Sequence, residues 1–364
     1  DLFWRSGAQR ITCDMSNPLS WNTLREWRFT IDSDDLELYI LRDHVFLLID
    51  LINDWSSGPP PEYLVFTPFN YILNLNFRNL KLYLNVNDAN IIDKPTLMDD
   101  NAFLILASPF LRAGTTISIS KYRPDKSSVP FQVHTDALDM SFHAPQWNTQ
   151  SAFVPTNELG HIQGLSLDGC YHYNALTAPG LTDTLTLSVT GQSAYAYIYG
   201  FVVRYFLLLK DNYFGDYVHF RTLDEYQEQL VLQQENPESL AKNRPPPKKS
   251  NDLDVILAVK VDNPKIMLPT NAYCSDRYIQ AELASIAVDL RNTNYYMDME
   301  LMLTPLNLSL GTPERHLDSP SVVSSNTQLF IDGLRIFGHR AFGLPPTEPT
   351  YLCNWDVSTG AIEG

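Results

Sequence analysis

Cysteine is scarce in this sequence. The 364 residues include four, Cys13, Cys170, Cys274 and Cys353, and no two of them form a CxxC pair. Zinc sites and disulfide frameworks both require cysteines that are paired at characteristic spacings. The sequence therefore predicts no metal site and no disulfide-stabilised fold, and it favours a reducing, cytosolic environment.

Long hydrophobic runs are missing as well. The two longest apolar stretches, 45–52 and 201–209, are interrupted by Asp50 and Arg204. A membrane-spanning helix needs about 20 apolar residues in a row, so we predict no transmembrane segment and no signal peptide. Patterned sequence reaches both ends of the chain, and we therefore expect an excised piece of a longer protein.

Basic residues are few compared with acidic ones. Lys and Arg number 26 against 42 Asp and Glu, which gives a formal net charge of −16. A protein that wraps nucleic acid needs clustered Lys and Arg to neutralise phosphates. Nucleic acid is therefore excluded as a partner, and an anionic bilayer would repel the chain if the chain lay flat on it.

Catalytic motifs are absent. The sequence contains no GxGxxG, P-loop, GxSxG or HExxH motif. His143, His161, His172 and His316 stand apart from one another, and a lone His is more often a surface or core residue than a ligand. A glycosidase would need two carboxylates that face one cleft, and no such pair is legible. We predict no enzymatic activity, no catalytic residue and no cofactor.

What the chain has in abundance is β-strand alternation. In the clearest segment Leu73, Leu75 and Phe77 alternate with Asn74 and Asn76. Comparable patterns predict strands over 27–32, 36–40, 71–78, 80–86, 102–107, 115–122, 130–143, 161–174, 185–189, 194–199, 253–262, 264–269, 278–290, 295–303, 328–338 and 350–357. Strands recur too often, and helices too rarely, for βαβ crossovers, so we expect a large antiparallel sheet.

Two short helices interrupt the strands. The first is predicted over about 43–55, where Val45, Leu48, Ile49 and Ile52 form one helical stripe, and the second over about 201–214. The polar segment 221–252 contains a triple proline and is predicted to be a mobile insertion.

The pattern also repeats along the chain. Three pairs of segments match at offsets of 184, 168 and 169 residues: 79–84 with 263–268, 139–145 with 307–313, and 163–169 with 332–338. We predict tandem repeats, the first over 1–180 and the second over 181–364, each with one short helix.

The apolar sides of these strands are the candidate functional surface. A sheet face this apolar must be covered, and a second sheet would give an ordinary β-sandwich core. Because each repeat offers only one helix and no Greek-key rhythm is visible, we instead favour a curved sheet with an apolar trough that solvates acyl chains. The predicted lipid-binding residues are Phe29, Ile31, Leu36, Leu38, Ile40, Leu73, Leu75, Phe77, Leu80, Leu82, Leu84, Val86, Val133, Met140, Phe142, Leu165, Leu167, Leu185, Leu187, Val189, Ile286, Val288, Leu290, Met299, Leu301, Leu303, Leu334 and Ile336.

Two blocks of sequence, 73–92 and 351–360, resemble the bridge-like lipid transfer proteins of the repeating β-groove type, in their Tweek branch. The resemblance covers most of the chain and is specific in these blocks. It implies units of five antiparallel strands and a connecting segment, which join into a rod with an apolar groove. It also implies a piece near the N-terminal end of a far longer protein.

The resemblance further implies a function. We expect non-vesicular transfer of glycerophospholipids between donor and acceptor membranes, at contact sites on the cytosolic face of the endoplasmic reticulum. The membranes would be reached through parts of the protein outside this chain, and adaptor proteins are further candidate partners. A carrier with a closed cavity for one lipid and a β-sandwich scaffold for protein partners are the alternatives. The alternation leaves open which sheet face is concave.

Overall fold

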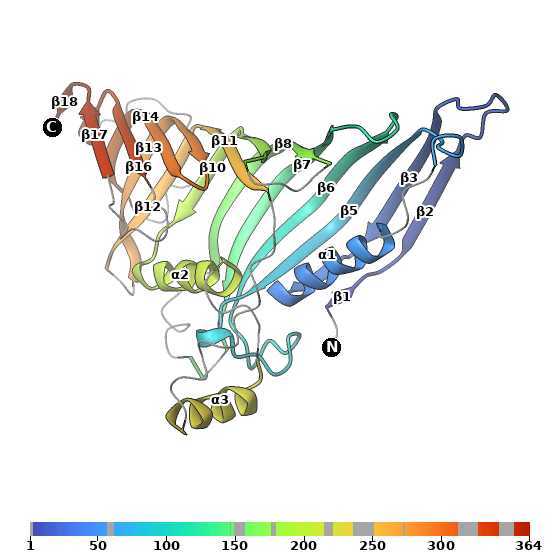
Figure 1. Ribbon diagram of the computed structural model, residues 1–364. Coiled ribbons are helices and arrows are strands. Elements are labelled where there is room, and N and C mark those ends of the chain that lie inside the picture. Colours follow the sequence, from blue (N-terminus) through green and yellow to red (C-terminus); the bar gives the residue numbers. More distant parts are fainter. Residues whose placement is uncertain are drawn as a thin grey trace.

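The structure is a computed structural model in which one curved sheet dominates (Figure 1). It describes residues 3–56, 62–145, 147–148, 157–175, 180–214, 221–235, 251–271, 274–311, 327–341 and 353–364. The described strands are β1 (Trp4–Arg5), β2 (Gln9–Met15), β3 (Arg25–Asp34), β4 (Glu37–Ile40), β5 (Phe69–Asn85), β6 (Phe103–Ile119), β7 (Lys126–His143), β8 (Glu158–Asn174), β9 (Thr182–Gly191), β10 (Ser193–Tyr197), β11 (Asp252–Asp262), β12 (Pro264–Asn271), β13 (Cys274–Asn292), β14 (Tyr296–Gly311), β15 (Thr327–Ile331), β16 (Leu334–Ala341), β17 (Cys353–Thr359) and β18 (Ile362–Glu363).

Three α-helices and one short 3-10 helix complete the described elements. They are α1 (Arg42–Ser56), α2 (Gly200–Phe214), α3 (Leu223–Glu235) and η1 (Asp88–Asn90). The predicted helices over 43–55 and 201–214 are confirmed as α1 and α2. Helix α3 lies inside the segment predicted as a mobile insertion, and 236–250 of that segment lie outside the described residues. The second repeat therefore has two helices where one was expected.

All the described strands belong to one 18-stranded sheet. Most neighbours pair antiparallel, as predicted, but β5 pairs parallel with β3 and β4, and β11 and β12 pair parallel with β9 and β10. The chain returns for these pairs through α1 and through α2 with α3. The expectation that no βαβ crossover occurs is therefore wrong at two places, because one or two short helices are enough to carry the chain back for a parallel pairing.

Among the described residues, five strands follow each crossover if a broken strand is counted once. After α1 the chain forms β5, β6, β7, β8 and the broken strand β9–β10, and after α3 it forms β11–β12, β13, β14, β15–β16 and β17–β18. Asn79 and Asn263, which the sequence comparison paired, occupy matching places in β5 and at the β11–β12 junction, with φ of 53° and 50°. The tandem β repeat is therefore a feature of the sheet. The division after residue 180 remains a prediction.

A line of backbone breaks crosses the strands, and we call it the seam. Asp35, Asn79, Gly164 and Asn263 adopt φ between 50° and 61° along it. Asp and Asn tolerate this left-handed region better than other side chains, and Gly adopts it freely. The Asn79 amide nitrogen donates to the Asp35 carboxylate across 3.0 Å, which ties neighbouring breaks together.

The seam shifts the alternation by one residue. Phe77 precedes it and Leu80 follows it, so the apolar positions of β5 change from odd to even numbers. The two sets nevertheless share a face, because Ser108, paired with Leu80, lies 2.6 Å hydroxyl to hydroxyl from Thr135, paired with Leu111 on the Phe77 side. One apolar face therefore continues across the seam.

The apolar face is the concave one. Helix α2 packs on it through Val202 and Tyr205, which contact Leu104 and Phe142 in one hydrophobic cluster. Figure 1 shows α1 and α2 within the curve of the sheet, between the wall at β2–β6 and the wall at β11–β18. The curved, mainly β trough predicted from the sequence is confirmed, and its apolar side faces the hollow.

Candidate functional site

The best-defined feature of the concave face is a row of apolar side chains that crosses twelve successive strand positions. We call it the central row. In register order it consists of Ile11, Ile31, Leu75, Ala113, Val133, Leu167, Val189, Val259, Val288, Leu301, Ile336 and Val357. Because neighbouring strands lie about 4.8 Å apart, the row extends over roughly 50 Å. It contains no polar side chain.

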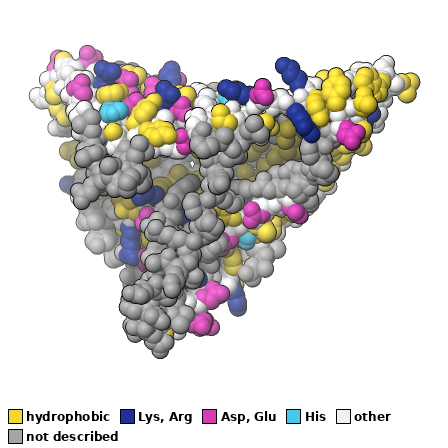
Figure 2. All heavy atoms as spheres, in the orientation of Figure 1, with side chains coloured by type: hydrophobic (Ala, Val, Ile, Leu, Met, Phe, Trp, Pro, Cys, Tyr) yellow, Lys and Arg dark blue, Asp and Glu magenta, His cyan; other side chains and the backbone are white. Residues whose placement is uncertain are grey.

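The central row is open along its length. Its end members Ile11 and Val357 are exposed, and the ten between them are half-buried. Figure 2 shows hydrophobic side chains deep in the hollow between the two walls. A closed sandwich core would bury these side chains fully, so the described part of the concave face is an apolar groove.

The opposite face of the same strands is polar. The residues adjacent to the central row in each strand form a second row on this face. It consists of Arg10, Asp32, Asn76, Arg112, His134, Ser166, Thr190, Lys260, Ala287, Met302, Arg335 and Ser358. Asn76 donates to Asp32 across 2.8 Å, and Arg335 pairs with Glu300 across 2.5 Å. The described part of the convex face is therefore more polar than the concave face.

The predicted lipid-binding residues within the strands fall together on the concave face. On the side of the seam that holds the central row, this is true of the predicted members of β3, β5, β7, β8, β9, β13, β14 and β16. On the other side, where α2 packs, it is true of the predicted members of β4, β5 and β7. Their role in lipid binding remains a prediction. The side chains of Val45, Leu48, Ile49 and Ile52 lie outside the described ones.

On the α2 side of the seam, part of the concave face is covered. Phe142 and Val86 are buried beneath α2, with exposed fractions of 2% and 1%, and Leu84 and Met140 pack against the same cluster. These positions belong to a closed core. Leu36, 3% exposed at the seam, is likewise buried.

A half-buried tyrosine, Tyr213, fixes α2 to the sheet. The Tyr213 hydroxyl donates to the Ile40 carbonyl at 2.5 Å and accepts from the Asn85 amide at 3.0 Å. Burial raises the pKa of Tyr213, so the hydroxyl keeps the proton that the first bond needs. Asn212 adds a bond from its amide nitrogen to the Asn87 carbonyl at 3.0 Å. The helix is thus attached to two adjacent strands, β4 and β5.

Polar groups enter the concave face towards the far end of the strands. Four residues along the strands from the central row, the register places Met15, Trp27, Tyr71 and Ile117 in one stretch. A second stretch holds Val129, Tyr171, Leu185, Val255, Asn292, Met297, Arg340 and Cys353. The Trp27 indole nitrogen is buried and has no hydrogen-bond partner among the described atoms. The groove therefore grades from apolar at its centre to mixed at its rim.

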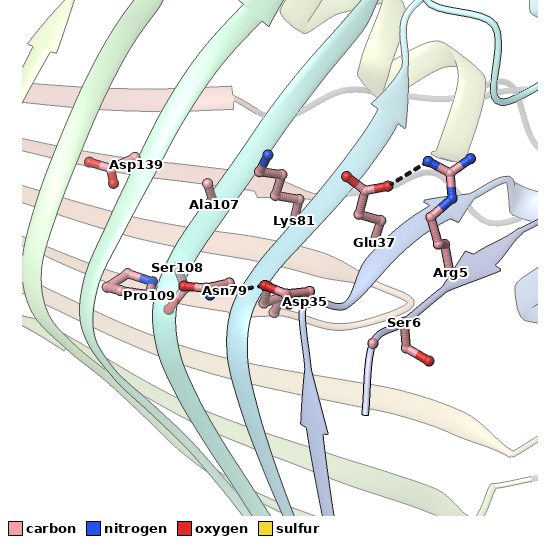
Figure 3. Close-up of a pocket in the computed structure, with 12 residues that line it drawn as sticks. Arg5, Ser6, Asp35, Glu37, Asn79, Lys81, Ala107, Ser108, Pro109 and Asp139 are labelled. Carbon is pink, nitrogen blue, oxygen red and sulfur yellow. Dashed lines mark hydrogen bonds and ion pairs between the residues drawn. The ribbon is translucent and has the colours of Figure 1, made fainter. Parts of the chain in front are cut away.

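The convex face has its own hollow, drawn in Figure 3. It measures about 610 Å3 and includes Arg5, Glu37, Lys81 and Asp139. Arg5 pairs with Glu37 across 3.3 Å, and the side chains around the hollow carry both signs of charge. Such exposed ion pairs are typical of a solvated surface and give no ligand preference.

The described side chains offer no catalytic or metal-binding arrangement. No group of three or more His, Cys, Asp or Glu among them could hold a metal ion. His161 pairs with Asp139 at 2.6 Å and His143 contacts the Met98 carbonyl at 2.8 Å, while His316 lies outside the described residues. Cys13, Cys170 and Cys353 are free thiols. Among the described helices, none is long and apolar enough to cross a membrane.

Comparison with known proteins shows the family of this chain. A family model described as the Csf1 N-terminal region matches residues 1–246. The chain belongs to this Csf1 N-terminal family. Protein CSF1 of Saccharomyces cerevisiae is 29% identical over the whole chain, and protein CSF1 of Eremothecium gossypii is 26% identical. The chain spans 13% and 14% of the lengths of these two proteins.

A more distant similarity reaches animal proteins. Human bridge-like lipid transfer protein family member 1 is 22% identical over 130 residues, which is 36% of this chain and 3% of the human protein. Membership of the Csf1 N-terminal family, with this similarity, places the chain among relatives of lipid transfer proteins. The resemblance seen in the sequence is confirmed.

Sequence reasoning missed some parts of this surface. Ile11 and Val357, the ends of the central row, and Ala113 and Val259 within it were not among the predicted residues. Ile11 alternates with Cys13 and Met15, which is a strand signal, but the polar neighbours of these residues obscured it. The polar side chains of the rim, Trp27 above all, could be found only from the register.

Proposed function

We propose that this region binds glycerophospholipids in its open groove and conducts them, without vesicles, between membranes joined by the longer protein. The observation that supports this most directly is the unbroken central row on a face that is open to solvent. Burying apolar area releases about 2.5 kcal/mol for each 100 Å2, so acyl chains lying along such a row are held without a specific contact.

The proposed mechanism is passive. Contacts between acyl chains and Val, Leu and Ile side chains are non-directional, so a lipid can move along the row without breaking hydrogen bonds. Head groups remain at the rim, where the exposed Asn292 offers polar atoms. Since the row carries no charge, we expect little selection among head groups. We place this activity at contact sites of the endoplasmic reticulum, with no covalent step.

The test is to count bound lipid. The purified chain is extracted with organic solvent, and phospholipid is measured per protein by mass spectrometry. Several glycerophospholipids per chain are expected for an open groove. One per chain would instead indicate a closed carrier, and none in a folded, detergent-free preparation would favour the scaffold.

Matched variants make the test specific to the groove. The triple variant Leu75→Asp, Val133→Asp and Leu167→Asp places three carboxylates in the central row, and lipid loading should fall at least about tenfold, because buried charge is costly. The control triple, Asn74→Asp, His134→Asp and Ser166→Asp, changes the residue beside each of these positions, on the convex face. Equal loss in both triples, with both folded by circular dichroism, would contradict the assignment of the groove.

A further inference from the structure

An exposed apolar corner lies at the end of the strands that is remote from α2. Three segments meet there: the β2–β3 loop, the segment before β5, and the β6–β7 turn. The Arg25 amide donates to the Pro68 carbonyl across 3.0 Å, and the rings of Tyr63 and Tyr122 are 5.2 Å apart. These contacts hold the three segments side by side.

We call this corner the tip. Nine of its large apolar side chains are exposed: Met15, Leu19, Trp21, Leu24, Tyr63, Leu64, Val65, Ile117 and Ile119. Leu19 is fully exposed, Trp21 is 71% exposed and Leu64 is 74% exposed. Figure 2 shows hydrophobic side chains gathered at this corner with Lys or Arg beside them. An exposed patch of this kind marks a surface that contacts a partner.

The charge at the tip differs from that of the chain. The β6–β7 turn carries Lys121, Arg123 and Lys126 against one carboxylate, Asp125, in a chain of net charge −16. Arg123 lies 5.2 Å from the centre of the Tyr122 ring. The remaining charged groups near the tip are Arg25, which lies 5.5 Å from the Phe69 ring, Arg28 paired with Glu26, and Asp14 and Glu62. The β6–β7 turn is therefore cationic, and the tip as a whole, with five basic and four acidic groups, is close to neutral, whereas the rest of the molecule is acidic.

The tip is continuous with the groove. Met15 and Ile117, exposed at the tip, belong to the same register stretch as Trp27 and Tyr71 on the concave face. Trp27 packs edge-on against Phe69 and Tyr71, at 5.1 and 6.0 Å between ring centres. An aromatic path thus leads from the rim of the groove to the exposed corner.

We infer that the tip inserts into the head-group layer of an anionic lipid bilayer. Trp and Tyr favour this layer because their rings are apolar while their N–H and O–H groups reach water. Lys121 and Arg123 supply attraction to anionic lipids, of the order of a fivefold gain in affinity for each cation. The acidic chain would be repelled if it lay flat, so the tip contacts the bilayer edge-on. This contact does not require lipid in the groove.

The test is vesicle flotation with the whole chain. The probes are phosphatidylcholine vesicles with phosphatidylserine and vesicles of phosphatidylcholine alone. The chain should float with the first and bind the second more weakly. Leu19→Glu with Trp21→Glu should lower binding at least about tenfold. Lys121→Glu with Arg123→Glu should remove the preference for phosphatidylserine. The fluorescence of Trp21 is obtained by subtracting the spectrum of the Trp21→Phe variant from that of the parent chain. Its emission maximum should shift to the blue when vesicles bind.

Leu47→Glu with Leu207→Glu is the matched control for the Leu19 and Trp21 pair, because Leu47 on α1 and Leu207 on α2 are 63% and 55% exposed, lie away from the tip, and the two changes add the same charge. It should float like the parent chain. Binding that falls equally in this control, or that survives the tip variants, would overturn the inference. The inference would also be overturned if the parent chain self-associated but did not bind vesicles, and if the tip variants lost that self-association. The tip would then be an interface between two copies of the chain.

The two proposals fail separately. The triple Asp variant of the central row should float normally although it carries no lipid. A parent chain that floats but carries no lipid would refute the groove proposal alone, and one that carries lipid but does not float would refute the tip alone.

Discussion

The two ends of β5 have the same alternation of apolar residues, but one end lines the open groove and the other is covered by a helix. Before the seam, Leu73, Leu75 and Phe77 are half-buried and line the open hollow. Beyond it, Leu84 and the adjoining Val86 pack under α2 in a closed cluster. The difference comes from the crossover helix, which reaches only part of the trough. An apolar strand face therefore becomes core or binding surface according to what covers it, and the strand sequence alone does not decide which.

The comparison predicts unequal costs for similar truncations, and this is the largest expected effect. Phe142→Ala should lower the free energy of unfolding by about 3–5 kcal/mol, because it opens a cavity beneath α2. Leu75→Ala should cost about 1 kcal/mol, because water and ligand already reach that side chain. Urea unfolding of both variants, after lipid extraction, measures the difference. A cost for Leu75→Ala as large as that of Phe142→Ala would show that the central row is a closed core.

Removing the attachment of α2 should have an intermediate effect. Tyr213→Phe deletes the bond to the Ile40 carbonyl and leaves the buried Asn85 amide without its acceptor, at a cost of about 1–3 kcal/mol. Tyr295→Phe is the control, because it removes one bond from an exposed hydroxyl to Asp252 and should cost less than about 0.5 kcal/mol. Urea unfolding tests the pair. Equal costs would mean that Tyr213 does not secure the helix.

The smallest expected effect concerns α1 and pH. The Leu41 amide donates to the His44 ring nitrogen across 3.2 Å, which requires a neutral ring, and burial lowers the pKa of His44. The folded state thus binds fewer protons at this site than the unfolded state. This stabilisation is complete above the unfolded pKa, about 6.5, and is lost as pH falls through the lowered folded value.

Urea midpoints at pH 7.5 and pH 5 measure this contribution. The parent chain should lose more stability between the two values than His44→Asn, whose side chain accepts the same bond without titrating in this range. An identical loss in the two proteins would indicate that His44 plays no part.

Much of this fold could be predicted from the sequence because a period of two identifies a half-buried strand directly. Leu73, Leu75 and Phe77 show it, and the register sets Leu75 between Ile31 and Ala113, which are 44 and 38 positions away in the sequence. The parallel pairing of β3 with β5 could not be predicted, because it depends on a crossover and not on local pattern. The strand 328–338 proved to be two strands, β15 and β16, because the pattern crosses the seam at Asp332 and Gly333.

The groove was harder to predict than the strands. The alternation identified which residues share a face, but Phe142 and Leu75 follow the same pattern, and only the position of α2 separates them. Trp27 carried no signal of its own, because its place at the rim follows from its partners Met15 and Tyr71. Whether a position is open or covered depends on tertiary packing, which one sequence does not encode locally.

The seam has a consequence for the inheritance of these strands. A single-residue deletion in a strand ordinarily turns every later side chain to the other face. At Asn79 the protein already contains such a shift. Odd-numbered residues of β5 face the groove before Asn79 and even-numbered residues face it afterwards, and one left-handed residue joins the two parts. Deleting Asn79 would leave Phe77 and Leu80 two positions apart, so β5 would keep both on one face but would lose the break that matches Asp35 in the neighbouring segment. An insertion in the loop before Phe69 would leave the break and both sets of positions in place. Length changes in this lineage should therefore accumulate between strands and spare the seam.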